Sequence, residues 1–312
     1  MSFFTVLTTR GIGESRILSD VPEIVVAVFR ILTHLGSPYT LFAMVSVLYL
    51  LGRRGLLVRR RAAFMLAIGV AAIGLTIGLK HLFALPRPPA SFRSGFGFPS
   101  GHAIGITAFW GAAALLIERG QWRHRAVLAG SVITLVAASR VIIGVHYLVD
   151  VLAGIAIGIG LLVTLVTIGP GFEMRGQMSA LVRPTHTDVT ATFGVATLLT
   201  IISIVIAPDE TGTLLGTGMA AASTAIWHRY GRTLGAIQLP IKLRTLLVGG
   251  TSLVIGFGVL ITAMIVNDTT YVAQIGAIAG SILIIPYAIS TGIFAAVTIL
   301  TTPFIANRAA DI

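Results

Sequence analysis

Nine long apolar stretches, separated by short polar segments, run along the chain. A helix of roughly 20 apolar residues is long enough to cross the hydrocarbon core of a bilayer. The pattern therefore predicts nine membrane-spanning helices, at about 38–52, 62–83, 102–117, 126–144, 148–168, 190–207, 212–227, 245–266 and 271–303. Two glycine pairs, Gly154 with Gly158 and Gly276 with Gly280, have the spacing of close helix packing in membranes.

A tenth apolar stretch, residues 21–36, is less clear. Its sequence "VPEIVVAVFRILTHLG" carries Glu23, Arg30 and His34. Two interpretations stay open. The segment either crosses the membrane with its polar face turned inward, or lies in the interface as an amphipathic helix.

Composition supports a membrane protein. Hydrophobic residues make up 55% of the chain and charged residues 11%, against about a quarter charged in ordinary soluble domains. The absence of cysteine excludes disulfides, thiolate metal sites and a cysteine nucleophile. The N-terminal "MSFFTVLTTRGIGESR" lacks the pattern of a cleaved signal peptide. We expect an all-α, multi-pass integral membrane protein of the cell membrane.

The positive charges are concentrated in alternate loops. Basic residues mark cytoplasmic loops, so the net charge of +11 reflects membrane orientation, and nucleic acid is not an expected partner. Two loops on the opposite side break the pattern, because they contain Lys80, Arg87, Arg93 and Arg140. Positive charges there indicate a bound anion. The predicted cytoplasmic basic residues are Arg53, Arg54, Arg59, Arg60, Arg61, Arg119, Arg123, Arg125, Arg175, Arg183, Arg229, Arg232, Lys242, Arg244 and Arg308.

The stretch "SRVIIGVHYLVD", residues 139–150, holds Arg140, His146 and Asp150, the only Asp, Glu, Lys, Arg or His residues between positions 126 and 168. His146 and Asp150 are four residues apart and would share one face of a helix that begins near His146. Asp150 can accept a hydrogen bond from one ring nitrogen, which leaves the other as a nucleophile or base. Arg140 offers a planar fork of donors suited to phosphate.

Two further clusters fall on the same predicted outer face. "PSGH" reads as a loop entering a helix, with Ser100 as a candidate cap and free backbone N–H groups that favour an anion. His102 could then donate a proton to a departing oxygen. Lys80 and Arg87 stand at the outer end of the preceding helix. Together the clusters predict a phosphate site with a nucleophile and an acid.

These segments resemble the signature of a known enzyme family. Lys80-x6-Arg87-Pro88, Pro99-Ser100-Gly101-His102 and Ser139-Arg140-x5-His146-x3-Asp150 are similar in order and spacing to the three motifs of the type 2 phosphatidic acid phosphatases. This family is also called the lipid phosphate phosphatases, and it shares its site with vanadium haloperoxidases.

The resemblance implies a six-helix core, no metal or other cofactor, and a phosphohistidine intermediate. His146 would be the nucleophile, Asp150 its orienting partner, and His102 the proton donor to the leaving group. The phosphoryl oxygens would be held by Lys80, Arg87, Ser100, the Gly101 amide and Arg140.

The resemblance covers roughly residues 21–168, and the polar stretch at 169–188 marks a boundary in composition. Residues 1–168 would form the phosphatase core, and the polar stretch 169–188 a cytoplasmic linker. Residues 189–312 would add a C-terminal bundle of about four or five transmembrane helices, with no assigned role. These helices could form a substrate groove, a homodimer face or a second site.

The expected reaction is hydrolysis of a lipid phosphate or diphosphate at the outer membrane face. Polyprenyl diphosphate is preferred, ahead of phosphatidylglycerophosphate and phosphatidate. Two alternatives stay open. One is a transporter or flippase that binds a lipid phosphate without cleaving it, although binding alone does not require a His–Asp pair and a second histidine. The other is phosphotransfer to an acceptor other than water.

Overall fold

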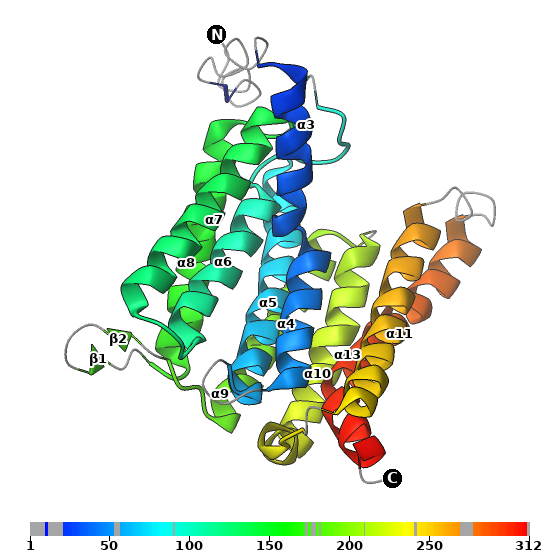
Figure 1. Cartoon of the computed structure of the whole chain (residues 1–312). Helices are drawn as coiled ribbons and strands as arrows, with labels where there is room; N and C mark the ends of the chain where they lie inside the picture. The colour runs from blue at the N-terminus through cyan, green and yellow to red at the C-terminus, as the bar shows by residue number, and fades with distance from the viewer. Residues whose placement is uncertain are drawn as a thin grey trace.

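The computed structural model describes residues 10–11, 21–52, 57–89, 91–171, 174–175, 179–180, 182–208, 210–239, 242–268 and 277–310. Helices dominate this part of the chain and run roughly alongside one another (Figure 1). A small antiparallel pair, β1 (Met174–Arg175) and β2 (Ser179–Ala180), interrupts them. The helices are α3 (Glu23–Leu32), η1 (Thr33–Gly36), α4 (Pro38–Leu51), α5 (Arg59–Phe83), α6 (Gly101–Leu116), α7 (Trp122–Ile142), α8 (Leu148–Ile168), α9 (His186–Ile206), α10 (Thr211–Ala236), α11 (Leu243–Asp268) and α13 (Ala277–Ala310).

The predicted all-α membrane fold is confirmed. A helix occupies each of the nine predicted apolar stretches, except that residues 271–276 of the last lie outside the described ranges. Among the described residues, six helices are long and apolar enough to cross a membrane: α5, α7, α8, α9, Leu243–Thr262 of α11 and Ile285–Ala309 of α13. The apolar helix α6 has only 16 residues. Helix α10 is long, but its glycine, threonine and serine residues make it less apolar.

Residues 21–36 continue into the next apolar stretch. Helices α3 and η1 meet α4 at a bend of 46°, and together they are apolar enough to form one broken span. The bend falls at Ser37, whose hydroxyl accepts a hydrogen bond from the Thr40 amide, and Pro38 follows it. Proline favours the first turn of a helix and disfavours helical geometry in the residue before it. The two stretches are therefore one bent unit, not two independent helices.

Helix α8 packs closely on α6 through the first predicted glycine pair. A Cβ atom on Gly154 would lie 2.7 Å from the Ser100 carbonyl oxygen, and one on Gly158 would lie 2.8 Å from the Ile104 carbonyl oxygen. This contact confirms the predicted close packing at Gly154 and Gly158. The surroundings of Gly276 and Gly280 lie outside the described part of the chain.

The C-terminal helices pack directly on the predicted core. Helix α9 lies along α5, where a Cβ atom on Gly74 would meet Thr200 within 3.0 Å, and the Ser203 hydroxyl donates to the Gly74 carbonyl oxygen at 2.6 Å. One hydrophobic cluster extends from Leu41 in α4 to Ala306 in α13. Helix α9 begins at His186, inside the predicted linker, because Thr185 and Asp188 cap its N-terminus.

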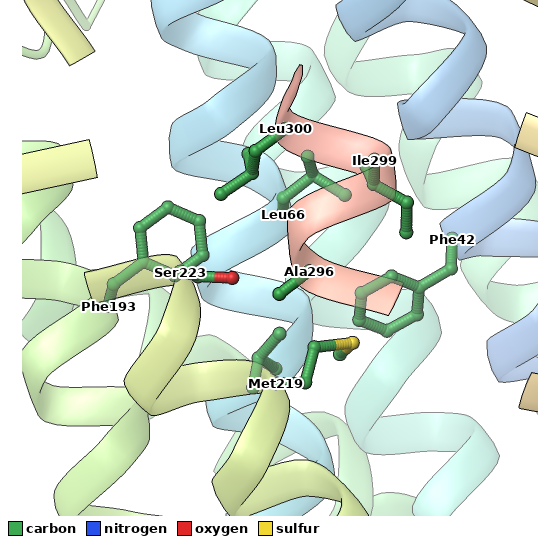
Figure 2. Close-up of a pocket in the computed structure, with 9 residues that line it drawn as sticks. Phe42, Leu66, Phe193, Met219, Ser223, Ala296, Ile299 and Leu300 are labelled. Atoms are coloured by element: carbon green, nitrogen blue, oxygen red, sulfur yellow. The ribbon is translucent and has the colours of Figure 1, made fainter. Parts of the chain in front are cut away.

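A small apolar pocket lies between α4, α5, α9, α10 and α13 (Figure 2). Ser223 supplies its one polar side chain. The lining contains no basic group that could hold a phosphate. The pocket is lined by Phe42, Leu66, Val70, Phe193, Met219, Ser223, Ala296, Ile299 and Leu300.

Arginines at the starts of the core helices tie loops together at one end of the bundle. Buried Arg59 donates to the carbonyl oxygens of Tyr49, Leu50 and Ile237. Helix α5 begins at this end, and the helices that follow alternate in direction. Helices α5 and α7 therefore end at the opposite end of the bundle, beside α3, and α6 and α8 begin there (Figure 1). The three motif segments therefore meet at a single end.

Candidate active site

The helix ends bring the three motif segments together. Lys80 stands in the last turn of α5, Arg140 in the last turn of α7, and Ser100 immediately before α6. Asp150 lies in the first turn of α8, and its carbonyl oxygen accepts a hydrogen bond of 3.0 Å from the Ser100 amide. This bond joins the second motif to the third.

His146 lies between a carboxylate and a guanidinium group. Its Nδ1 atom is 3.5 Å from Oδ2 of Asp150, and its Nε2 atom is 3.2 Å from Nη1 of Arg87. The imidazole is 3% exposed and Asp150 is fully buried. The Tyr147 amide donates to Oδ2 of Asp150 at 3.1 Å, so the turn that starts α8 also positions the carboxylate.

The surroundings of His146 favour a neutral imidazole. Its pKa is lowered from 6.5 to about 4, mainly by burial and additionally by the positive charges of Arg87, Lys80 and Arg140, while the interaction with Asp150 opposes the shift. A neutral ring retains a lone pair on one nitrogen at physiological pH. His146 therefore has the protonation state that a nucleophile requires.

Protein oxygens hold the three predicted cations. Lys80 Nζ donates to the Phe96 carbonyl oxygen at 2.7 Å. Arg87 donates to the carbonyl oxygens of Ser94 at 3.0 Å and Val145 at 3.1 Å. These hydrogen bonds to uncharged carbonyl oxygens hold the Lys80 ammonium and Arg87 guanidinium groups in place and leave their positive charges uncompensated.

Arg140 connects the site to the N-terminal helices. Its Nη1 atom donates to the Thr33 hydroxyl at 2.8 Å, and both residues are buried. Thr33 belongs to η1, within the stretch 21–36. This stretch therefore contributes directly to the surroundings of the site, although its own sequence signals no such role.

Three buried polar atoms at the site have no hydrogen-bond partner in the part of the chain that the structure describes. They are the Ser100 hydroxyl oxygen, Arg140 Nε and His146 Nδ1, the last of which lies 3.5 Å from Oδ2 of Asp150. Buried polar groups are rarely left without partners. A phosphate ion has the acceptor oxygens that the Ser100 hydroxyl and the Arg140 Nε–H group lack.

Gly101 follows Ser100 at the start of α6, and the space beside it is restricted. A Cβ atom at this position would lie 2.6 Å from Cγ2 of Thr76 and 3.7 Å from Cε of Lys80. A glycine therefore lets the start of α6 approach α5 and its terminal lysine.

His102 lies in the first turn of α6 and is half-buried. Arg140, His146 and Lys80 are close enough to interact with it electrostatically. Each predicted site residue therefore lies at the same end of the bundle.

The structure adds an arginine that sequence reasoning missed. Arg10 donates through Nε to Oδ1 of Asp150 at 2.9 Å, across 140 positions of sequence. No local pattern could have indicated this contact, because only the tertiary fold brings the two residues together. Arg93 also lies near enough to act on the charges of Arg87, Arg140 and His102.

The comparisons agree with the predicted resemblance. Residues 60–172 match the PAP2 superfamily, a range that contains all three motif segments. Residues 60–172 are therefore similar to the PAP2 superfamily. It is 29% identical over 141 residues to "Phosphatidylglycerophosphatase B" of Bacillus subtilis (strain 168), a match that covers 41% of this chain and 67% of that protein. No solved structure matches the chain.

The PAP2 match and the phosphatidylglycerophosphatase relative together support a phosphoric ester hydrolase, and the apolar helices fit a multi-pass membrane protein. The superfamily match ends at residue 172, so it does not include the helices from α9 onward. Arg10 and Thr33, which both contact site residues, precede the PAP2 region.

Proposed function

We propose that this protein hydrolyses a lipid phosphate or diphosphate at the outer membrane face, through a phosphohistidine on His146. The observation that carries the proposal is the position of the imidazole. Asp150 lies on the Nδ1 side and Arg87 on the Nε2 side. An Nδ1–H directed at Asp150 leaves the Nε2 lone pair on the side of the phosphate-binding cations.

The phosphoryl group would be held by charge and by the start of α6. Lys80, Arg87 and Arg140 supply the cations, and the Gly101 amide and Ser100 hydroxyl supply further donors. The unpartnered Ser100 Oγ and Arg140 Nε atoms support this assignment. Such fixed donors stabilise the negative charge of the transition state, which is the main requirement of phosphoryl transfer.

The reaction would proceed in two displacements. Nε2 of His146 attacks phosphorus, so that a P–N bond forms and the P–O bond to the lipid breaks. The lipid oxygen leaves with the bonding electron pair and takes a proton from protonated His102. Water then attacks phosphorus and gives a proton to His102, the P–N bond breaks, and phosphate leaves.

Two features support a lipid substrate at the outer face. Arg59 and Arg61, two of the predicted cytoplasmic arginines, lie at the start of α5 and hence at the end of the bundle opposite the site. Leu82, Phe83 and Phe92 are exposed on the segments around the site. Apolar side chains beside a phosphate site suit a substrate that carries hydrocarbon chains.

The division of the chain belongs to the same proposal. Residues 1–168 would be the phosphatase core, 169–188 a cytoplasmic linker, and 189–312 an extension. Polyprenyl diphosphate remains the preferred substrate because an outer-face site suits recycling of a carrier lipid. The name of the Bacillus subtilis relative supports phosphatidylglycerophosphate as the second substrate to test, and phosphatidate is the third.

The test is phosphate release by purified protein in detergent with EDTA, with all three lipids and His146→Ala as the control. We expect release from at least one lipid and none from the variant. No release from any of them, together with retained lipid binding, would contradict the proposal and favour a transporter. Release that appears only when an alcohol acceptor is added would favour a phosphotransferase.

A further inference from the structure

Arg10 contacts the first and third motif segments and Phe98, the residue immediately before the second. Its Nε and Nη2 atoms donate to Oδ1 and Oδ2 of Asp150 at 2.9 and 3.4 Å. Nη2 also donates to the Pro86 carbonyl oxygen at 2.8 Å. The guanidinium carbon lies 5.8 Å from the centre of the Phe98 ring and 5.2 Å from that of Tyr147. Arg10 therefore occupies the junction of the segments that carry the site.

The contacts of Arg10 determine the orientation of the Asp150 carboxylate. Asp150 is fully buried, and the Arg10 side chain is 8% exposed. The fork of a guanidinium group matches the two oxygens of a carboxylate and fixes their common plane. Oδ2, which faces Nδ1 of His146, accepts from both Arg10 and the Tyr147 amide. Rotation of the carboxylate away from His146 would break these bonds.

We propose that Arg10 is a positioning residue for the phosphatase reaction, because it holds the Asp150 carboxylate in the plane from which it orients His146. This inference rests on the proposed function. Arg10 lies outside the PAP2 region, residues 60–172. The site of this protein would therefore include a residue from beyond the superfamily domain.

Loss of Arg10 should affect orientation more than charge. Lys80 and Arg87 also interact electrostatically with Asp150, so a compensating positive charge would remain. Arg10 is not among the groups proposed to hold phosphate. The defect should therefore appear in kcat, whereas KM and the affinity for a phosphate analogue should change little.

The experiment compares phosphate release by wild type, Arg10→Ala, Arg10→Lys and Arg123→Ala. We expect kcat of Arg10→Ala to fall about 10- to 100-fold, the usual effect of removing an outer-sphere partner, with KM within about threefold of wild type. Arg10→Lys retains the positive charge but lacks the planar guanidinium group that can donate to both carboxylate oxygens, and its kcat should be intermediate. Arg123, exposed at the start of α7, is the matched control and should behave as wild type.

Vanadate affinity, measured by calorimetry, provides a readout that does not depend on turnover and should be unchanged in Arg10→Ala. A wild-type kcat in Arg10→Ala, a loss confined to KM, or a kcat above wild type would overturn the inference. If Arg10→Ala is not monodisperse in detergent, the inference is tested with Arg10→Lys instead. A reduced kcat of Arg10→Lys with unchanged vanadate affinity supports the inference, and a wild-type kcat overturns it. If the wild-type protein itself releases no phosphate from the tested lipids, the proposed function is overturned instead.

Discussion

Nε2 of His146 lies 3.2 Å from Nη1 of Arg87, so a permanent cation faces the imidazole on the side opposite Asp150. The ring is thereby oriented along a line between a carboxylate and a guanidinium group. This arrangement disfavours a second proton on the ring, because the new N–H would point at a positive charge. It also places the lone pair where an incoming phosphoryl group would be attracted.

The pH dependence of catalysis should reflect this arrangement. The pKa of His146 is lowered to about 4, mainly by burial, and the proposed nucleophile is the neutral form. Activity is therefore lost as pH falls through that pKa, and kcat/KM should stay level down to about pH 5. Arg87→Gln removes one cation beside His146, so the residual activity of this variant should fall at a higher pH than that of the wild type. If the activity of the wild type fell with an apparent pKa near 6.5, the ordinary value for histidine, the assignment of His146 as a nucleophile with a lowered pKa would be contradicted.

Asp150→Asn should lower kcat by about 100-fold or more, because an amide cannot hold the imidazole in the same tautomer. Asp188→Asn is a matched control. Both carboxylates accept a hydrogen bond from a backbone amide at a helix N-terminus, from Tyr147 in one case and Thr185 in the other. Only Asp150 faces a histidine ring. Equal losses of kcat in both variants would show that Asp150 acts through helix capping alone.

Gly101→Ala should destabilise the protein by about 1–3 kcal/mol, the usual cost of overpacking, and should reduce kcat by displacing the start of α6. Gly105→Ala, one turn further along α6, has no atom within 4 Å of its added Cβ and should cost little. Thr76→Ser removes the methyl group that the new Cβ would meet. The double variant should therefore recover the unfolding temperature, and its failure to do so would exclude this steric explanation.

Chelators should leave activity intact, and vanadate should inhibit. Among the described residues, no group of three His, Cys, Asp or Glu side chains could hold a metal ion, and the cations of the proposed site come from Lys80, Arg87 and Arg140. Vanadate resembles phosphate and should compete with the substrate in initial-rate measurements. Loss of activity in EDTA with rescue by a divalent ion, or insensitivity to millimolar vanadate, would count against the site.

The sequence predicts the helices well because lipid imposes a simple pattern on them. Each apolar stretch that is long enough to cross a bilayer is identifiable without any knowledge of its neighbours. The motif residues are likewise predictable, because Lys80, Arg140 and His146 are polar groups at the ends of apolar helices. Their common location then follows from the alternating direction of the helices.

Contacts between distant segments could not be predicted in the same way. Arg10 reaches Asp150, and Thr33 accepts from Arg140, over separations of 140 and 107 residues. Neither Arg10 nor Thr33 stands out locally, since an arginine or threonine in a polar or amphipathic stretch has many ordinary explanations. The bend at Ser37 was similarly obscured, because the sequence shows two apolar stretches and not the angle between them.

The contact between Ser203 and the Gly74 carbonyl oxygen has a consequence for biosynthesis. Gly74 and Gly78 form a shallow groove on α5, and Thr200 and Ser203 of α9 fill it. A nascent chain inserted only as far as α8 would present this groove to lipid, although all three catalytic motifs had already been synthesised. The helix that carries Lys80 therefore acquires its full set of neighbours only after α9 and α10, which also packs on α5, have left the ribosome.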